Sequence, residues 1–144
     1  MNVTDIPIVS IVTFLPLLGA LVVAVLPGGR PNLVRWTALG FALLAWVASL
    51  LLLYGFTPGR PGFEYVEAVP WIEMFGIQYK VGVDGLSLAM VVLTTTLTAI
   101  SILASFGPIQ HRVKEYMVAF LVLEVGMTGV FVALDLFLFY VFWE

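Results

Sequence analysis

The sequence predicts an all-α polytopic membrane protein with four complete transmembrane helices, the start of a fifth, and a short outer-surface β-hairpin between the second and third helices. The 144 residues are 62% hydrophobic and only 10% charged, whereas an ordinary soluble domain is about 25% charged. Four stretches reach the roughly 20 apolar residues that a helix needs to cross a bilayer. Between the second and third stretches, apolar and polar residues alternate, which is typical of strands.

The first two predicted spans cover residues 8–27 and 33–55. Between them, the segment Gly28–Pro31 contains two glycines and a proline, residues that end a helix and begin a turn. The first ten residues contain no basic side chain and include Asp5, whereas a cleaved secretory signal begins with positive charge. We therefore expect the first span to be retained.

Residues 56–83 are predicted to form the hairpin outside the membrane. Apolar and polar residues alternate in two runs, residues 63–65 and 77–83, with the period of a strand. Pro70–Trp71 and Gly76 interrupt the pattern, so we expect them to lie between the two strands. The tryptophan of this segment is expected at the lipid interface, where tryptophan is enriched.

The third and fourth spans are predicted at residues 84–106 and 115–133. Asp84 directly precedes the third apolar run, where an aspartate can cap the first turn of a helix. Gly107–Pro108 follows that run and is a typical stop signal.

A fifth span begins after the turn at Leu134–Asp135 and covers residues 135–144. A helix from Asp135 to Glu144 extends only about 14 Å, less than half of the roughly 30 Å hydrocarbon core. A chain end there would leave a carboxylate and unpaired carbonyls in hydrocarbon, at a cost of several kcal/mol each. We therefore expect residues 1–144 to be the N-terminal part of a longer protein.

The basic residues predict the orientation, because Lys and Arg in short loops stay on the cytoplasmic side. The connections between spans one and two and between spans three and four, with their flanks, contain Arg30, Arg35, Arg112 and Lys114. The hairpin connection is net acidic, with Arg60 and Lys80 against Glu64, Glu67, Glu73 and Asp84. The N-terminus is therefore expected on the outer, periplasmic side.

The composition also excludes several kinds of site. The absence of cysteine excludes disulfides, thiolate metal sites and a cysteine nucleophile. The single histidine, His111, lies beside Arg112 in a polar stretch, which favours a solvated side chain over a metal ligand. Glycine-rich phosphate loops, ligand clusters and serine triads are absent from the sequence, and a net charge of −3 without a basic cluster argues against nucleic acid. We expect no catalytic residue, metal, cofactor or redox centre in this chain.

Two carboxylates within the apolar spans are the candidate functional residues, Glu124 and Glu144. A charge at the centre of a membrane helix costs about 2.5–3.5 kcal/mol on insertion scales, so such residues usually face a protein interior or a water path. Each lies about ten residues from the predicted turn, which places both roughly 15 Å deep, near the midplane. The sequence predicts proton translocation at these residues but leaves open whether their side chains face each other.

Structural alternatives stand beside this prediction. Glu124 can equally be a protonated hydrogen-bond partner between helices. The hydroxyls of Thr94, Thr95, Thr96, Thr98 and Ser101 are expected to bond to carbonyls of their own helix; the alternative is that they support a water chain. Gly126 and Gly129 are expected to allow close packing of the fourth helix. The sequence has no lysine or arginine at membrane depth, so a cationic partner must come from sequence beyond residue 144 or from another subunit.

Three phrases carry a family resemblance: VGVDGLSLAM at residues 81–90, FEYVEAVPWIEMFGIQYKVGVDG at the hairpin, and LEVGMTGVFVALDLFLFYVFWE at residues 123–144. They resemble subunit M of proton-translocating NADH:quinone oxidoreductase, respiratory complex I, the counterpart of mitochondrial subunit 4 and of the equivalent plastid protein. The resemblance implies that Glu144, in the FWE motif, is an essential acid that pairs with a lysine on a later helix. Glu124 matches a position where many members also carry glutamate.

The resemblance further implies a membrane-arm subunit that takes part in proton translocation coupled to quinone reduction. FMN, iron–sulfur clusters and quinone would be bound by other subunits, and the partners would be neighbouring antiporter-like subunits and the lipid bilayer. The location would be the cell inner membrane, or the mitochondrial inner or thylakoid membrane. The alternatives are a subunit of a cation/proton antiporter or membrane-bound hydrogenase, and a small membrane scaffold without transport.

Overall fold

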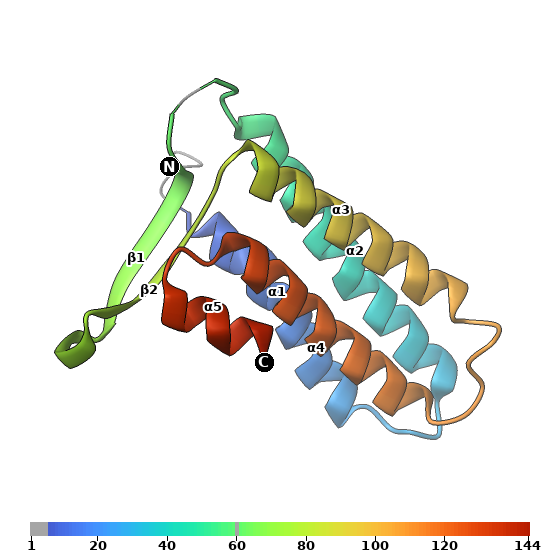
Figure 1. Cartoon of the computed structure of the whole chain (residues 1–144). Helices are drawn as coiled ribbons and strands as arrows, with labels where there is room; N and C mark the ends of the chain where they lie inside the picture. Colours follow the sequence, from blue (N-terminus) through green and yellow to red (C-terminus); the bar gives the residue numbers. More distant parts are fainter. Residues whose placement is uncertain (1–5, 60) are drawn as a thin grey trace.

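The computed structural model describes residues 6–59 and 61–144, and its four long helices form a bundle (Figure 1). Each of the four is long and apolar enough to cross a membrane. The predicted all-α membrane fold is therefore confirmed. The helices are α1 (Ile8–Val25), α2 (Pro31–Gly55), α3 (Gly85–Ala104) and α4 (Val113–Val132).

Two of the helix boundaries follow directly from local chemistry. Asp84 caps α3 as expected, because its carboxylate accepts a hydrogen bond of 2.8 Å from the backbone N–H of Ser87. This bond holds the pKa of Asp84 below its usual value. Pro31 is the first residue of α2, a position where the missing N–H costs nothing and the fixed φ suits a helix.

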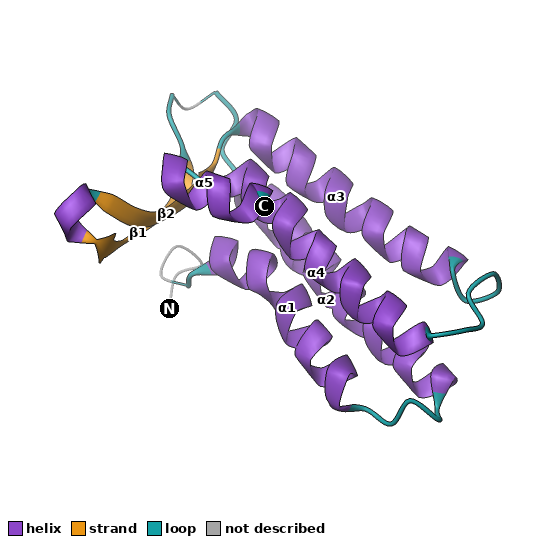
Figure 2. Cartoon of the chain, turned by 60° about the horizontal axis from the view of Figure 1, so that its bottom comes forward, coloured by secondary structure: helices purple, strands orange, loops and turns teal. Residues whose placement is uncertain are grey.

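A short fifth helix, α5 (Leu136–Trp143), turns back after α4 and lies along it (Figure 2). Its hydrogen bonding continues into Glu144, whose N–H donates to the carbonyl of Tyr140. The start of a fifth helix is therefore confirmed.

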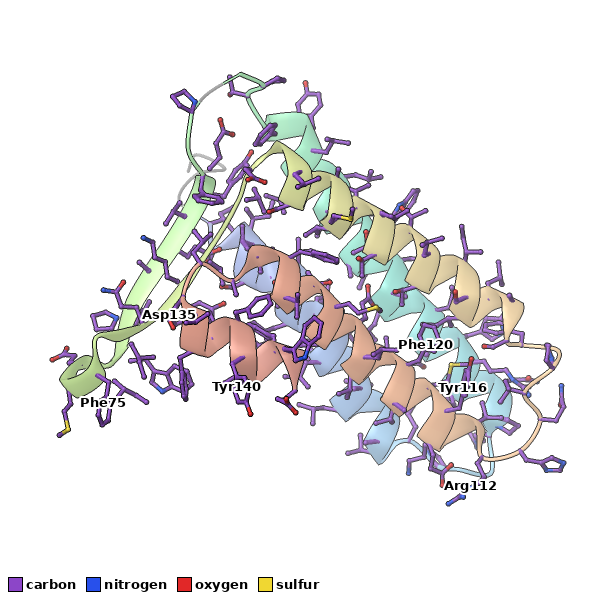
Figure 3. The ribbon with its side chains drawn as sticks, viewed as in Figure 1. Phe75, Arg112, Tyr116, Phe120, Asp135 and Tyr140 are labelled. Atoms are coloured by element: carbon purple, nitrogen blue, oxygen red, sulfur yellow. The ribbon has the colours of Figure 1, made fainter. Side chains whose placement is uncertain are left out.

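The predicted β-hairpin between the second and third helices is also confirmed. Strand β1 (Glu64–Ile72) pairs antiparallel with β2 (Ile77–Val83). A short 3-10 turn, η2 (Glu73–Phe75), joins them, and Gly76 closes it with a φ of 67°, which glycine adopts at little cost. The tip of the hairpin, marked by Phe75, extends away from the bundle (Figure 3).

The expected break at Pro70–Trp71 is wrong, because both residues lie within β1. Pro70 lies opposite Gln78, and the register shifts between Pro70 and Ile72. Both strands of a two-stranded sheet are edge strands, where a proline without an N–H is tolerated. Trp71 packs edge-on against Phe137 of α5, with ring centroids 5.5 Å apart, and its position at the lipid interface stays a prediction.

Two ends of the bundle can be distinguished by their charge. The hairpin end has the hairpin and the turn at Asp135 (Figure 3), together with Asp84, which directly follows β2 and caps α3. The opposite end, called the basic end below, contains Arg30, Arg35, Arg112 and Lys114. Two charged residues from the sequence prediction, Asp5 and Arg60, lie outside the described residues.

The buried interior contains two apolar clusters, and each draws residues from all four long helices. The cluster nearer the basic end is built around Val23, Ala38, Ile102, Met117 and Leu121. The cluster nearer the hairpin end is built around Val12, Leu52, Val81, Val91 and Val132.

Candidate functional site

A layer of buried polar side chains separates the two apolar clusters. On every long helix, these polar residues lie in sequence between members of one cluster and members of the other. All are almost fully enclosed. The polar layer consists of Thr13, Ser49, Thr95, Thr98, Glu124 and Thr128.

Glu124 is the ionisable member of this layer. Its side chain is 0% exposed, and that of Thr128, one helical turn further along the same face of α4, is 1% exposed. Within residues 6–59 and 61–144, neither carboxyl oxygen of Glu124 nor the hydroxyl of Thr128 has a hydrogen-bond partner. A buried polar group left in this way costs about 1–3 kcal/mol, so the pair is an exception that requires an explanation.

Three of the neighbouring hydroxyls, those of Thr13, Ser49 and Thr95, are bonded to carbonyls of their own helices. Thr13 donates to the carbonyl of Val9 at 2.8 Å, and Thr95 donates to the carbonyl of Val92 at 3.0 Å. The hydroxyl oxygens of Ser49 and Thr95 lie 2.8 Å apart, so one of the two can donate to the other and join α2 to α3 in place of its bond to its own helix. In this layer, Glu124 and Thr128 thus differ from Thr13, Ser49 and Thr95, whose hydroxyls are hydrogen-bonded.

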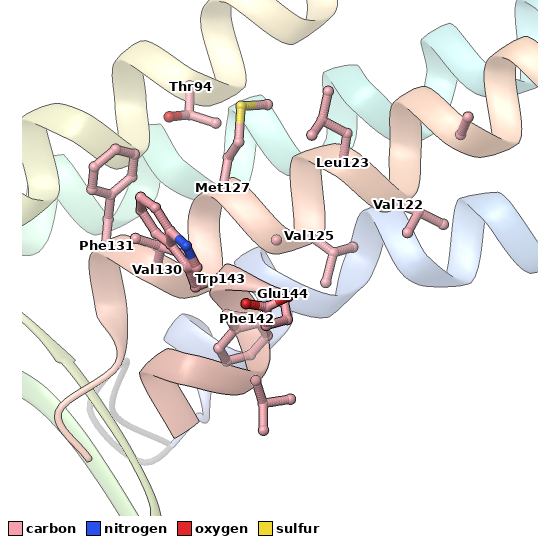
Figure 4. Close-up of a pocket in the computed structure, with 13 residues that line it drawn as sticks. Thr94, Val122, Leu123, Val125, Met127, Val130, Phe131, Phe142, Trp143 and Glu144 are labelled. Atoms are coloured by element: carbon pink, nitrogen blue, oxygen red, sulfur yellow. The ribbon is translucent and has the colours of Figure 1, made fainter. Parts of the chain in front are cut away.

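Glu144 lies in a different place, in an open groove of about 960 Å³ between α4 and the end of α5 (Figure 4). The groove is lined mainly by apolar side chains, including Val122, Met127 and Val130 of α4. The hydroxyl-bearing Thr94 of α3 also lines it. Glu144 is exposed there.

Two glycines of α4 determine how α5 is seated. A Cβ atom at Gly129 would overlap the ring of Phe142, and a Cβ atom at Gly126 would come within 3.3 Å of the Phe142 carbonyl. The expected close packing of α4 at these glycines therefore occurs, and the partner is α5. Because Glu144 is two residues beyond Phe142, the glycine seat also positions Glu144.

The two candidate acids lie at similar distances from the turn but on opposite faces of α4. Glu124 precedes the last residue of α4 by eight positions, and Glu144 follows the first residue of α5 by eight, about 12 Å of helix in each case. The buried face of α4 carries Glu124 with Leu121 and Thr128, whereas the groove face carries Val122, Gly126 and Val130. The structure thus does not bring Glu124 and Glu144 together, and α4 itself lies between them.

Asp135 connects the hairpin to the turn before α5, a role that the sequence analysis missed. Its carboxylate caps α5 by accepting from the N–H groups of Phe137 and Leu138, and it also accepts from the N–H of Gln78 in β2. The bond from Gln78, followed by those within α5, holds the pKa of Asp135 below its usual value. An aspartate directly before an apolar run is a cap signal that could have identified half of this role.

A second attachment joins β1 to α1. The two carboxylate oxygens of Glu67 accept from the N–H of Ser10 at 3.1 Å and from its hydroxyl at 2.8 Å. The Ser10 hydroxyl is also 2.6 Å from the phenol oxygen of Tyr79. Burial, opposed by this hydrogen bond and assisted by the nearby Glu67 carboxylate, raises the pKa of Tyr79. Because the partners are far apart in sequence, no local pattern indicates this contact.

At the basic end, Arg35 is buried and ties two connections together. Its guanidinium donates to the side chain of Asn32 and to the carbonyl of Ile109, both at 2.9 Å. The loop before α4 is thereby held against the start of α2. In the described parts of the chain, acidic residues and histidines form no cluster of three that could hold a metal ion.

Comparisons with known proteins agree with this architecture. The family described as the amino terminus of NADH-ubiquinone oxidoreductase chain 4 matches residues 32–134. NADH-quinone oxidoreductase subunit M of Rhodobacter capsulatus is 50% identical over 95% of this chain and 27% of its own length. NADH-ubiquinone oxidoreductase chain 4 of Marchantia polymorpha is 40% identical over 90% of this chain and 26% of its own length.

A solved structure, respiratory complex I from Thermus thermophilus with bound NADH, contains a chain with the same fold. The TM-score is 0.75 at 24% identity, over 94% of this chain and 26% of the other. The chain spans about a quarter of the length of the relatives it matches. The resemblance carried by the VGVDGLSLAM and FWE phrases is confirmed, and the chain belongs to the NADH-ubiquinone oxidoreductase chain 4 family.

Proposed function

We propose that this chain is part of a membrane-arm subunit of NADH:quinone oxidoreductase and that Glu144 and Glu124 take part in proton translocation coupled to quinone reduction. The observation that carries the proposal is the position of Glu144, an acid at the level of the α4 midpoint, in an open apolar groove. Family membership supplies the context, because the relatives are subunits of this oxidoreductase.

The groove suits a group that exchanges protons with a partner. Its walls are mainly apolar side chains, which strengthen the interaction of a carboxylate with any cation that packs beside it. The family resemblance assigns that partner to a lysine of a later helix. In this arrangement Glu144 takes up or releases a proton as the distance to the ammonium changes, because a nearby cation favours the charged carboxylate.

The charge distribution supports an orientation with the N-terminus on the outer side. Four of the six basic residues, Arg30, Arg35, Arg112 and Lys114, belong to the basic end, and basic residues in short loops stay in the cytoplasm. The hairpin end would then face the periplasm, or the equivalent compartment of an organelle.

The relatives come from bacteria and from mitochondrial or plant sources, so the cell inner membrane or an organellar inner membrane is the proposed location. The proposed partners are other membrane-arm subunits, including antiporter-like neighbours. FMN, iron–sulfur clusters and the quinone would belong to other subunits of the complex.

The test is Glu144→Gln in the full-length subunit within the assembled complex. We expect NADH-driven acidification of inverted membrane vesicles to fall by about tenfold or more, because a positioned proton-transfer group contributes about a hundredfold or more. Quinone reductase activity is expected to fall with it, since the two processes are coupled. Both rates are measured in the same vesicles.

Glu115→Gln is the matched control, since Glu115 is an exposed acid in the first turn of α4, and it should leave both rates unchanged. Normal pumping by a fully assembled Glu144→Gln complex would refute the proposal and favour the scaffold alternative. Sodium-dependent transport without NADH oxidation would instead favour the antiporter alternative.

A further inference from the structure

The unpaired groups of the polar layer point to a ligand that the protein itself does not supply. Glu124 and Thr128 present three buried oxygen atoms without partners among the described residues. They come from positions four apart on α4, so the carboxyl and the hydroxyl project from the same side of the helix. Buried polar groups in folded proteins are almost always satisfied by protein or by ordered water.

The surroundings keep this site apart from both ends of the bundle. Leu121 on one side of Glu124 belongs to the cluster of the basic end, and Val132 on the other side belongs to the cluster of the hairpin end. Both residues are at most 1% exposed. A small polar molecule between the two clusters would therefore be enclosed.

The chemistry of the site matches water. A water molecule can donate to a carboxyl oxygen and accept from a hydroxyl, and a buried water typically makes about three hydrogen bonds. The hydroxyls of Thr13, Ser49 and Thr95 already donate within the protein, but each oxygen keeps a lone pair that can accept from water. Glu124 is the only ionisable side chain among the polar residues of this layer.

We propose that Glu124 and Thr128 bind ordered water inside the α1–α4 bundle, and that this enclosed Glu124–water site holds a proton separately from the groove at Glu144. The second clause rests on the proposed function, whereas water binding does not. Since α4 lies between the two acids, the Glu124 site exchanges its proton through the bundle interior and not through the groove.

The experiment uses the intact complex, with infrared difference spectroscopy during hydrogen–deuterium exchange and a high-resolution density map. The carboxyl band of Glu124 is assigned by its loss in Glu124→Gln. In the unmodified complex we expect this band to shift in deuterated water, and we expect water density between the Glu124 carboxyl and the Thr128 hydroxyl.

Thr128→Val removes the hydroxyl at nearly constant volume, so the water density should be lost and the Glu124 band should shift. Ser105→Ala is the control. Its hydroxyl is also buried and bonded to its own helix, but it lies outside the polar layer, so its loss should leave the Glu124 band and the water density unchanged.

Three outcomes would overturn the inference: a Glu124 band that does not respond to deuterated water, density showing a direct Glu124–Thr128 hydrogen bond without water, or a band that depends on sodium because a cation occupies the site. These outcomes are independent of the Glu144→Gln test. Loss of pumping in Glu144→Gln together with a dry Glu124 would refute the water site alone. Normal pumping together with water at Glu124 would refute the proposed function and the proton-holding role that rests on it, but not water binding.

Discussion

Glu124 and Glu144 lie at similar distances from the turn between α4 and α5, but their surroundings are opposite. Glu124 is enclosed on the buried face of α4, whereas Glu144 lies in the open groove beside the other face of that helix. On the inner face, Glu124 is fully enclosed between two apolar clusters, and its nearest sequence neighbour with a polar group on that face is Thr128. On the groove face, Gly126 and Gly129 allow α5 to pack closely against α4, and this packing brings Glu144 to the open groove.

This difference separates two ways in which a membrane helix can present a carboxyl group. An enclosed acid can exchange a proton only with what is already inside the bundle. An acid in a groove can exchange with whatever packs there, and its environment therefore changes when a neighbouring helix moves. Four predictions test the comparison, from the largest expected effect to the smallest.

The largest effect is expected from Gly129→Ala, which disturbs the packing of α5 on the groove face of α4. The added methyl group would overlap the Phe142 ring, and overpacking of this kind costs about 1–3 kcal/mol. We expect α5 to shift and vesicle acidification to fall severalfold, although both acids remain. Gly40→Ala on α2 is the control, because a methyl group there meets nothing within 4 Å. Equal pumping by the two alanine variants would show that the glycine seat does not position Glu144.

Glu124→Leu tests the buried face of α4 by removing the carboxyl group that lies there. If Glu124 is retained for proton transfer and not for packing, the complex should keep or gain thermal stability, because an apolar side chain replaces a buried carboxyl group. Acidification should nevertheless decline. Thermal unfolding and pumping are measured on the same preparation.

Leu121→Met, a substitution of similar volume on the same buried face, is the control for repacking. A Glu124→Leu complex that is less stable than the control and fails to assemble would support the alternative in which Glu124 is only a hydrogen-bond partner between helices.

Asp135→Ala is expected to weaken the attachment of α5 to strand β2 of the hairpin. The variant loses the cap of α5 and the acceptor for Gln78, so hydrogen–deuterium exchange should quicken in peptides covering β2 and the first turn of α5. Because the pKa of Asp135 is lowered in the folded protein, its stabilising effect is complete above the usual aspartate range and is lost as the pH falls through the lowered value. Asp84→Ala, a cap on α3, should leave exchange at β2 unaffected, and faster β2 exchange in both variants would contradict the assigned link.

The smallest effect is expected from Glu67→Gln, which weakens the attachment of the hairpin to α1. The amide offers one acceptor oxygen in place of two, so one of the two bonds from Ser10 is lost, at a cost of about 1 kcal/mol. Exchange should quicken in β1 while α5 stays protected. Glu73→Gln at the exposed tip of the hairpin should change neither, and loss of α5 protection in the Glu67 variant would mean that the two attachments act as one.

Much of the fold could be predicted from local sequence patterns, which apply in membrane proteins as well as in soluble ones. Apolar length predicts the four spans, the cap at Asp84 marks the start of α3, and alternation predicts the hairpin. Pro70 misled the strand prediction because a proline is excluded from central strands but not from edge strands.

The sequence could not predict into which surroundings the side chains of Glu124 and Glu144 project, and the reason is physical. In a soluble helix the buried face is apolar and the exposed face polar, but in lipid both faces are apolar. Leu121 is buried and Val122 is half-exposed, yet both are apolar residues of α4, so hydropathy does not distinguish their two faces. The direction of Glu124 therefore became clear only from the packing of α4 against its neighbours.

The hydrogen bond between the indole N–H of Trp46 and the hydroxyl of Thr96, at 2.9 Å between α2 and α3, has an optical consequence. The other three tryptophans, Trp36, Trp71 and Trp143, each expose half or more of their surface. Brominated lipid chains should therefore quench the fluorescence of Trp36, on the same helix, more strongly than that of Trp46. In a subunit in which Trp46 is the tryptophan that remains, a shift of its emission wavelength would report a change in the contact between α2 and α3.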